Sequence, residues 1–499
     1  MPKISLGKSR SSLCARVSVN FPLNLGERTA LTSQHTPLDQ TPKLQSSAIP
    51  PEALEVLRAL EEAGYESWIV GGFLRDALLG RNPSDVDIAT SALWTESRDV
   101  FLARGWRTHE TGTAHGTITA IVGDKAFEVT TFRSDGAYDD ARHPSRVTFV
   151  KSIDDDLSRR DFTMNALAYH PERGFRDPFG GLADIESGTI RAVGDPEARF
   201  REDALRIVRA CRFVGQLGFS IDEASYRGMC SSKGRLCLVS KERILHELRL
   251  LMVSPHAGKA IRETVDALSA VLPELVAMKG FDQHSPYHAY DVLEHTARVV
   301  DGVRPSEDLR WAALFHDAGK PAACYIDEDG RGHFRGHPAI SAQIAKGAMD
   351  RLGMSSAFED RVIQLVLHHD DRIEPSKPSV KRAVVKMGGD VELVWALFEL
   401  KRSDALAHAP THTERAKLAD ELQDILDEIV EEGEALSLRD LDIDGNDVMR
   451  LGVPKGPRVG QALDAALDAV IEDRVPNNKE ALTDFVCAWQ LAQESENGR

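Results

Sequence analysis

The 499-residue sequence contains only six cysteines, and none of them forms a C-x-x-C pair. This spacing excludes a disulfide framework and a zinc ribbon, and it suits a reducing compartment. No apolar run approaches the roughly 20 residues that cross a bilayer, so we expect no membrane segment and a cytoplasmic location. Positive charge is also scarce, because the net charge is −17. A protein coated in nucleic acid is therefore disfavoured, whereas an RNA partner held by a local basic surface remains open.

The first 45 or so residues are rich in Ser, Thr and Pro, and they contain no acidic residue before Glu27. They lack the apolar core of a secretory signal. A disordered extension at 1–45 is favoured over a transit peptide.

Beyond residue 45 the patterns predict an α+β fold. Short apolar runs such as 117–122 and 127–132 alternate with helical stretches up to about residue 190, and helical spacing dominates after residue 200. We expect a mixed α/β domain at 46–190 and helical domains at 191–280, 281–410 and 411–499. The stretches 201–213, 241–252, 291–300, 309–315, 341–352 and 414–434 are the expected helices.

The most informative motif is Asp85-Val86-Asp87, nine residues after Gly71-Gly72-x-x-Arg75-Asp76. Alternate side chains of a strand point to one face, so Asp85 and Asp87 should project together with Val86 buried behind them. Two carboxylates that close repel unless a cation lies between them, and Mg²⁺ prefers such oxygen ligands. The glycines predict a tight turn that exposes backbone N–H groups to phosphates.

Three later motifs add candidate site residues. Glu128 is a possible third carboxylate, and an exposed residue on an edge strand is an equally good interpretation. The pair Arg160-Asp161 suggests sugar and phosphate contacts, although Asp161 could be a helix N-cap. Asp203 and Arg206, three residues apart, should share one helical face. The carboxylate would accept from the exocyclic amine of cytosine or adenine, and the guanidinium would donate to the adjacent ring nitrogen. Uracil and guanine would leave these groups unpaired.

In this order the motifs resemble the class II CCA-adding tRNA nucleotidyltransferases of the poly(A) polymerase head family. The motifs are Gly-Gly-x-x-Arg-Asp, Asp-Val-Asp, Glu-Val-Thr-Thr-Phe-Arg, Arg-Arg-Asp-Phe-Thr-Met-Asn-Ala and Glu-Asp-Ala-Leu-Arg, and the resemblance covers about 50–260. It implies that Asp85 and Asp87 hold the metal ions, for which Mg²⁺ is expected, while Glu128 stays a candidate catalytic residue from the strand pattern alone. The implied nucleotide-binding residues are Gly71, Gly72, Arg75, Asp76, Arg160, Asp161, Asn165, Asp203 and Arg206.

The resemblance implies that CMP and AMP are added to the 3′ end of tRNA from CTP and ATP, with tRNA as partner and no DNA. A poly(A) polymerase, an A-adding enzyme and a CC-adding enzyme are the alternatives. The polar loop 135–146 resembles one that CC-adding relatives lack, which disfavours that alternative. We expect this loop to close over substrate.

Ten of the seventeen histidines fall between His284 and His412. Adjacent His316-Asp317, with His295 before and Asp404 after, resembles the HD phosphohydrolase superfamily. The resemblance implies a divalent metal of unknown identity on these four residues, with Lys320 near the substrate phosphate. His337 and His368 are candidates for a second metal. An alternative function of another class is therefore phosphohydrolysis of RNA ends or nucleotides, whereas a pure binding protein is disfavoured by the cost of clustered carboxylates.

Overall fold

The computed structural model describes residues 44, 49–81, 83, 85–110, 112–135, 147–285, 289–408 and 414–497. The chain divides into two units, 1–43 and 44–499. The predicted N-terminal extension and most of the predicted closing loop lie outside the described residues. No described helix is long and apolar enough to span a bilayer.

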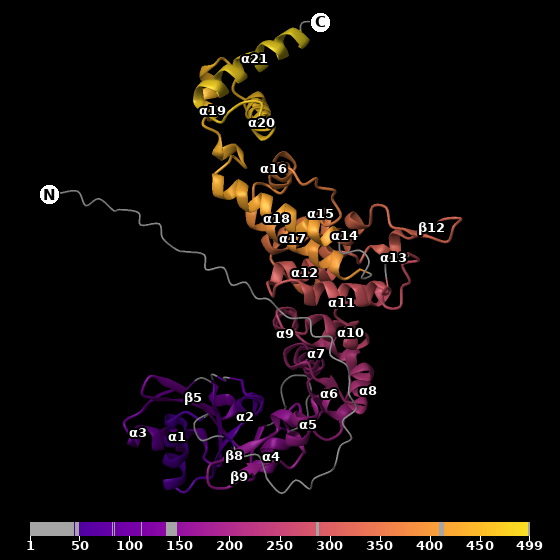
Figure 1. The fold of residues 1–499 in the computed structure, drawn as a ribbon. Helices are drawn as coiled ribbons and strands as arrows, with labels where there is room; N and C mark the ends of the chain where they lie inside the picture. The colour runs from indigo at the N-terminus through magenta and orange to yellow at the C-terminus, as the bar shows by residue number, and fades with distance from the viewer. Residues whose placement is uncertain are drawn as a thin grey trace, which may run out of the picture. The chain divides into compact units, whose positions relative to one another are not determined.

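The first part of the described chain is a seven-stranded sheet with helices, as the indigo and violet ribbon of Figure 1 shows. The strand order is β3-β4-β5-β2-β1-β8-β9. The strands are β1 (Ser67–Val70), β2 (Asp87–Thr90), β3 (Arg107–His109), β4 (Thr117–Val122), β5 (Lys125–Thr131), β8 (Ala168–His170) and β9 (Gly174–Arg176). The helices are α1 (Pro51–Glu62), α2 (Gly72–Leu78), α3 (Trp94–Ala103), α4 (Ile153–Ser158) and α5 (Gly181–Ser187), with the 3-10 turn η3 at Thr163–Asn165.

The two faces of this sheet pack against different helices. Ile69, Ile88 and Val129 belong to a buried cluster that includes residues of α1 and α3. Trp68, Val70 and Ala89 point to the other face, where they cluster with residues of α4. The strand alternation therefore places Asp87, two residues before Ala89, on the α4 face.

Short pairs of strands complete this region. β6 (Arg133–Asp135) pairs with β7 (Val147–Phe149), and these two strands flank the predicted closing loop. β10 (Thr189–Ile190) pairs with β11 (Ser220–Ile221), which links the sheet region to the helices that follow. The predicted strands at 117–122 and 127–132 are confirmed to within two residues.

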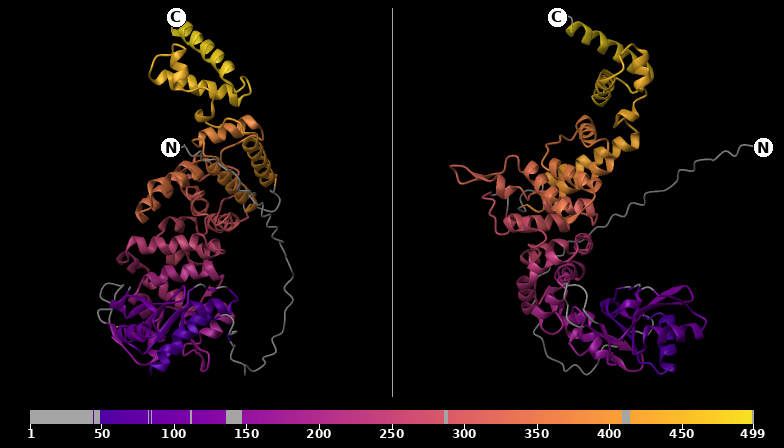
Figure 2. Two further views of the ribbon diagram at one scale, coloured as in Figure 1. Left: turned by 90° about the vertical axis from the view of Figure 1, so that its left-hand side faces the viewer. Right: turned by 180° about the vertical axis from the view of Figure 1, so that it is seen from behind.

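Helices dominate the rest of the chain in every view of Figure 2. The next helices are α6 (Pro196–Glu202), α7 (Leu205–Leu217), α8 (Glu223–Ser232), α9 (Lys241–Met252) and α10 (Ala257–Leu268). The histidine-rich region forms α11 (Val292–Gly302), α12 (Glu307–Phe315), α13 (Lys320–Ala323), α14 (His337–Leu352), α15 (Ser356–His368), α16 (Lys377–Lys386) and α17 (Val391–Leu406). A hairpin of β12 (Tyr325–Ile326) and β13 (Gly332–His333) separates α13 from α14.

The last helices are α18 (Glu414–Glu432), α19 (Gly445–Arg450), α20 (Pro457–Ile471) and α21 (Lys479–Asn497). One cluster of buried apolar residues has members from Leu44 to Leu436, and another has members from Ala435 to Val486. The α+β fold predicted from the sequence is confirmed. One predicted helix is wrong in detail, because 201–213 is broken at Asp203, whose backbone is extended (φ −134°, ψ 105°).

Candidate nucleotide and metal sites

Three carboxylates, Asp85, Asp87 and Glu128, lie near the start of β2. Asp87 begins the strand and lies in register with Glu128 on the parallel strand β5, so both side chains leave the same face of the sheet. Asp85 and Asp87 are exposed, and Val86 between them is 4% exposed, as the alternation predicts. Desolvation in the site raises the pKa of Asp87, and the negative charges of Glu128 and Asp85 raise it further against the opposing effect of Arg160. Such clustered negative charge is the donor set that a hard divalent cation fits.

Gly71 forms the turn between β1 and α2 beside these carboxylates. Its φ of +79° and ψ of −148° lie in a region that suits glycine. A Cβ at this position would be 3.0 Å from Arg160 Nη1 and 3.5 Å from Asp87 Oδ2. The absence of a side chain therefore leaves room for a ligand between the arginine and the carboxylate.

Asp156 on α4 holds two arginines at the site. This carboxylate is fully buried and accepts from Arg159 Nε (3.0 Å) and from Arg160 Nη2 (3.2 Å). It also accepts from the backbone N–H of Arg133, at the start of β6. Burial opposes ionisation, but the two guanidinium groups outweigh it and lower the pKa of Asp156.

A second chain of polar contacts starts at α2. Arg75 binds Asp76 through two nitrogens and donates to Asn165 Oδ1 at 2.7 Å. Asn165 donates to Asp161 at 3.0 Å, and Asp161 accepts two further bonds from Arg209 on α7. Although burial opposes it, the Arg209 guanidinium holds the pKa of Asp161 well below its usual range. Asp161 is therefore no helix N-cap but a charged link between the sheet region and α7.

Asp203 and Arg206 both line the site, but they do not share one helical face as predicted. Asp203 is not helical but lies at the break between α6 and α7, where its Oδ1 accepts from the backbone N–H of Leu205. Its Oδ2 accepts from Arg243 on α9 at 3.1 Å. Arg206 donates to Glu202 (2.7 Å) and to the Arg159 carbonyl (3.0 Å).

Many of these residues, including Asp87 but not Asp85 or Glu128, border one cavity of about 530 Å³. Asp76 does not line it and contacts it only through Arg75. The lining is Gly71, Gly72, Arg75, Asp87, Arg159, Arg160, Asp161, Asn165, Asp203, Leu205, Arg206, Arg209, Arg212, Phe213, Gln216 and Arg243. Seven arginines against three aspartates make this cavity basic in an acidic protein, which suits a polyphosphate ligand.

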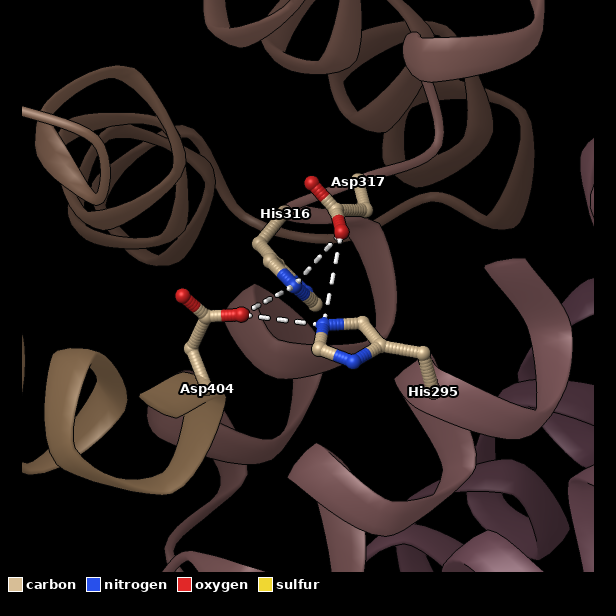
Figure 3. A group of neighbouring side chains, drawn as sticks. All are labelled: His295, His316, Asp317 and Asp404. Carbon is tan, nitrogen blue, oxygen red and sulfur yellow. Dashed lines mark hydrogen bonds and ion pairs between the residues drawn. The ribbon is translucent and has the colours of Figure 1, made fainter. Parts of the chain in front are cut away.

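The histidine-rich helices build a second site. His295 of α11, His316 and Asp317 at the end of α12, and Asp404 of α17 point toward one another (Figure 3). His295 Nε2 is 2.9 Å from Asp404 Oδ1 and 3.5 Å from Asp317 Oδ2. His316 Nε2 is 3.2 Å from Asp317 Oδ2. Nitrogen and carboxylate oxygen ligands at these spacings fit a divalent metal.

Two buried polar atoms of this cluster are ones that a bound cation would satisfy. His316 Nε2 and Asp317 Oδ2 are buried, and neither has a hydrogen-bond partner of suitable geometry. Burial disfavours the charged imidazolium, yet Asp317 and Asp404 outweigh it and raise the pKa of His316 to about 10. A metal ion in place of that proton would satisfy both carboxylates. Lys320 Nζ lies 2.7 Å from Asp317 Oδ2 and supplies one positive charge beside this carboxylate.

The predicted second pair of histidines needs one correction. His337 Nε2 lies 3.3 Å from Asp317 Oδ1 and 3.1 Å from His369 Nε2, so Asp317, His337 and His369 form a further group that could hold a metal. His368 is not part of it, because its Nδ1 is 2.8 Å from Asp371 Oδ2. Adjacent residues of a helix point about 100° apart, so only one of the two histidines can face the cluster.

Known protein families match successive and partly overlapping stretches of the chain. The Poly A polymerase head domain matches residues 67–191, and the probable RNA and SrmB-binding site of polymerase A matches 218–278. The HD domain matches 287–437, and a putative tRNA nucleotidyltransferase domain 2 matches 400–486.

Full-length relatives agree with these matches. The CCA-adding enzyme of Geobacillus thermodenitrificans is 35% identical over 89% of this chain and 98% of its own length. The chain belongs to the CCA-adding enzyme family. The CCA-adding enzyme of Lactobacillus johnsonii is 32% identical over 87% of the chain and 96% of its own length. The crystal structure of the Bacillus stearothermophilus CCA-adding enzyme in complex with CTP is 29% identical, covers 90% of this chain and all of that one, and superposes with a TM-score of 0.65.

Several site residues of this member of the CCA-adding enzyme family were not predicted from the sequence. Arg209 and Phe213 follow Arg206 at i+3 and i+7, so the helical repeat alone could have indicated them. Arg243 gave no such signal, because its contact with Asp203 joins two helices far apart in sequence. His369 follows the buried residues Val362, Leu365 and Val366 in helical spacing, and this stripe distinguishes it from His368.

Proposed function

We propose that this chain adds CMP and AMP, from CTP and ATP, to the 3′ end of tRNA. The observation that carries the proposal is the register of Asp87 with Glu128, which puts two carboxylates on one face of the sheet, with Asp87 lining an arginine-rich cavity. The RNA 3′-oxygen attacks the α-phosphate, its proton is released, and the bond to pyrophosphate breaks.

Asp85 and Asp87 would hold Mg²⁺, and Glu128 supplies a third carboxylate beside them. When bound, the ion activates the attacking hydroxyl and neutralises charge on the phosphates. Arg160, fixed by Asp156 and close to Asp87, lies where it can bind the triphosphate. Gly72 and Arg75 border the same space, and Asp76 orients Arg75.

The other end of the cavity supports a choice of base. Asp161, Asn165, Asp203 and Arg206 all line this cavity, where Asp161 and Asn165 would approach the ribose and Asp203 and Arg206 the base. Arg206 is fixed by Glu202 and by the Arg159 carbonyl, and Asp203 is fixed by Arg243. A rigid acceptor and donor favour the amine and ring nitrogen shared by cytosine and adenine.

A transcript of tRNA lacking its last three nucleotides tests this proposal. After incubation with CTP, ATP and Mg²⁺, we expect sequencing to show C-C-A and no further addition. Long A tails would indicate a poly(A) polymerase, and A-only or C-only products would indicate the partial enzymes. Asp87→Asn should lower the rate at least about 100-fold, whereas Asp124→Asn, an exposed carboxylate in the β4–β5 turn, should not change it.

The histidine cluster supports a second function, hydrolysis of phosphates on RNA ends or nucleotides. Its ligands would be His295, His316, Asp317 and Asp404, with His337 and His369 at a second metal and Lys320 near the substrate phosphate. We expect release of phosphate from RNA with a 3′-phosphate or 2′,3′-cyclic phosphate. His316→Ala should abolish this release without lowering CCA addition, and His333→Ala, an exposed histidine of β13, should affect neither. If His316→Ala abolishes CCA addition and Asp87→Asn does not, the proposed transferase site is wrong.

The predicted boundaries at 46–190, 191–280, 281–410 and 411–499 stay part of this proposal, as does a cytoplasmic location. The HD domain match to 437 includes α18, which packs along α17. Limited proteolysis followed by mass spectrometry would place the boundaries.

A further inference from the structure

A separate cavity of about 300 Å³ lies between the end of α15, α16 and α17. Its lining is His368, Asp371, Arg372, Ile373, Ser379, Arg382, Ala383, Lys386, Met387 and Leu397. None of these residues takes part in either metal group. His368 and His369 are neighbours in sequence, but His368 faces this cavity while His369 faces Asp317 and His337.

The floor of this cavity is apolar. Ile373, Met387 and Leu397 are at most 8% exposed, and Ala383 of α16 lies beside them. Such a surface offers a flat organic ring a place to pack without reading its polar edge. It does not by itself attract a simple inorganic anion.

The rim is cationic. Arg372, Arg382 and Lys386 surround it, and Asp371 is the one carboxylate in the lining. Lys386 Nζ and His368 Nδ1 both contact Asp371 Oδ2, at 2.7 and 2.8 Å. Arg372 and Arg382 contact Glu374 and Glu472, which lie outside the lining. The lining itself therefore holds three cationic side chains against one carboxylate, in a chain whose net charge is −17.

The turn that carries His368 and Asp371 is held firmly. Lys401 Nζ donates to the carbonyls of His369 (2.6 Å) and Asp371 (2.7 Å). The wall that carries His368 and Asp371 is therefore built before any ligand arrives.

We propose that this cavity binds a nucleoside monophosphate, with the base on the Ile373–Ala383–Met387–Leu397 floor and the phosphate at Arg372, Arg382 and Lys386. The volume is at the small end of the range for small-molecule sites, roughly 300–1,000 Å³. Because the floor has no polar groups to read base edges, the site accepts any base. The bound nucleotide has two possible sources, a free nucleoside monophosphate or the terminal nucleotide of an RNA.

The test is calorimetric titration of the full chain with 5′-GMP in EDTA. Guanine is disfavoured by the predicted base-reading residues Asp203 and Arg206, and the chelator removes metal-dependent binding at both other sites. We expect Lys386→Gln to weaken 5′-GMP binding about tenfold or more, since it removes one charge-assisted contact. The matched control is Lys346→Gln, because both lysine side chains are 56% exposed and each pairs with an aspartate.

A second variant tests the floor. Ala383→Leu fills the base site but keeps the charges, so it should weaken 5′-GMP and leave inorganic phosphate binding unchanged. A 5′-phosphorylated RNA hexamer in a further titration distinguishes the two sources of nucleotide. Equal 5′-GMP affinity in the wild type and Lys386→Gln, or 5′-GMP binding no tighter than inorganic phosphate, would overturn the proposal. Either of these two results would leave the proposal of CCA addition unaffected.

Discussion

Gly71 shows how a single residue keeps the nucleotide site open. Any side chain here would meet two costs, an unfavourable backbone conformation and contact with Arg160 and Asp87. The two costs differ in their consequence, because backbone strain lowers stability whereas the contacts obstruct the site.

We therefore expect Gly71→Ala to lower kcat/KM for CTP strongly and to destabilise the protein by about 1–3 kcal/mol. Gly64→Ala is the matched control, since Gly64 has φ +89° and nothing within 4 Å of its added Cβ. This control should lose similar stability but keep its activity. Equal activity in both variants would contradict the assignment of this space to substrate.

Asp161 is a buried carboxylate whose charge is stabilised by the fold at neutral pH. Its folded-state pKa is depressed by Arg209, Asn165 and Arg206 against the opposing effect of burial. The stabilisation is therefore fully present above its unfolded pKa of about 4, and it is lost as the pH falls below that value.

Asp161→Asn should cost about 3 kcal/mol at pH 7, because it leaves Arg209 without a bidentate partner. The difference from wild type should shrink as the pH is lowered from 5 to 2. Urea unfolding across this range measures both effects. Glu247, 3.6 Å from Arg209, keeps part of its charge balanced. A difference that stays constant with pH would show that Asp161 is protonated in the folded state.

At the scale of elements, the break between α6 and α7 positions the base-reading carboxylate. Continuous apolar periodicity through 201–213 predicted one helix, and no glycine or proline marks the break. The structure ends α6 at Glu202 and uses Asp203 to cap the backbone at Leu205 and to bind α9. The contact of Asp203 with Arg243 of the distant helix α9 therefore outweighs the local preference for a continuous helix.

Arg243→Met should free Asp203 while keeping the aliphatic packing of the side chain. We expect UTP and GTP to be incorporated at higher rates relative to CTP and ATP, by about tenfold, because the acceptor is no longer fixed. Competition assays on the truncated tRNA measure this ratio. Arg249→Met, a more exposed arginine six residues along the same helix, is the control. An unchanged ratio would assign Arg243 to stability alone.

At the scale of the whole molecule, metal binding should stabilise the histidine-rich region because its ligands come from α11, α12 and α17. Mn²⁺ at about 100 times its dissociation constant would add about 2.7 kcal/mol. We expect a higher thermal midpoint for wild type and a smaller shift for His316→Ala, with metal content measured by mass spectrometry. His109→Ala, an exposed histidine in β3, should retain the wild-type shift. Equal metal content in wild type and His316→Ala would refute the ligand set.

The sequence by itself determined the α+β order of elements, the projection of Asp85 and Asp87, and the positions of most helices. These features depend on local periodicity, which neighbours in sequence set directly. The tertiary structure alone decided that Glu128 faces Asp87, that Asp203 leaves its helix for Arg243, and that Arg209 balances Asp161. Each of these depends on the register of strands or the packing of helices that are distant in the chain, and a register is fixed only when the whole sheet and its covering helices are in place.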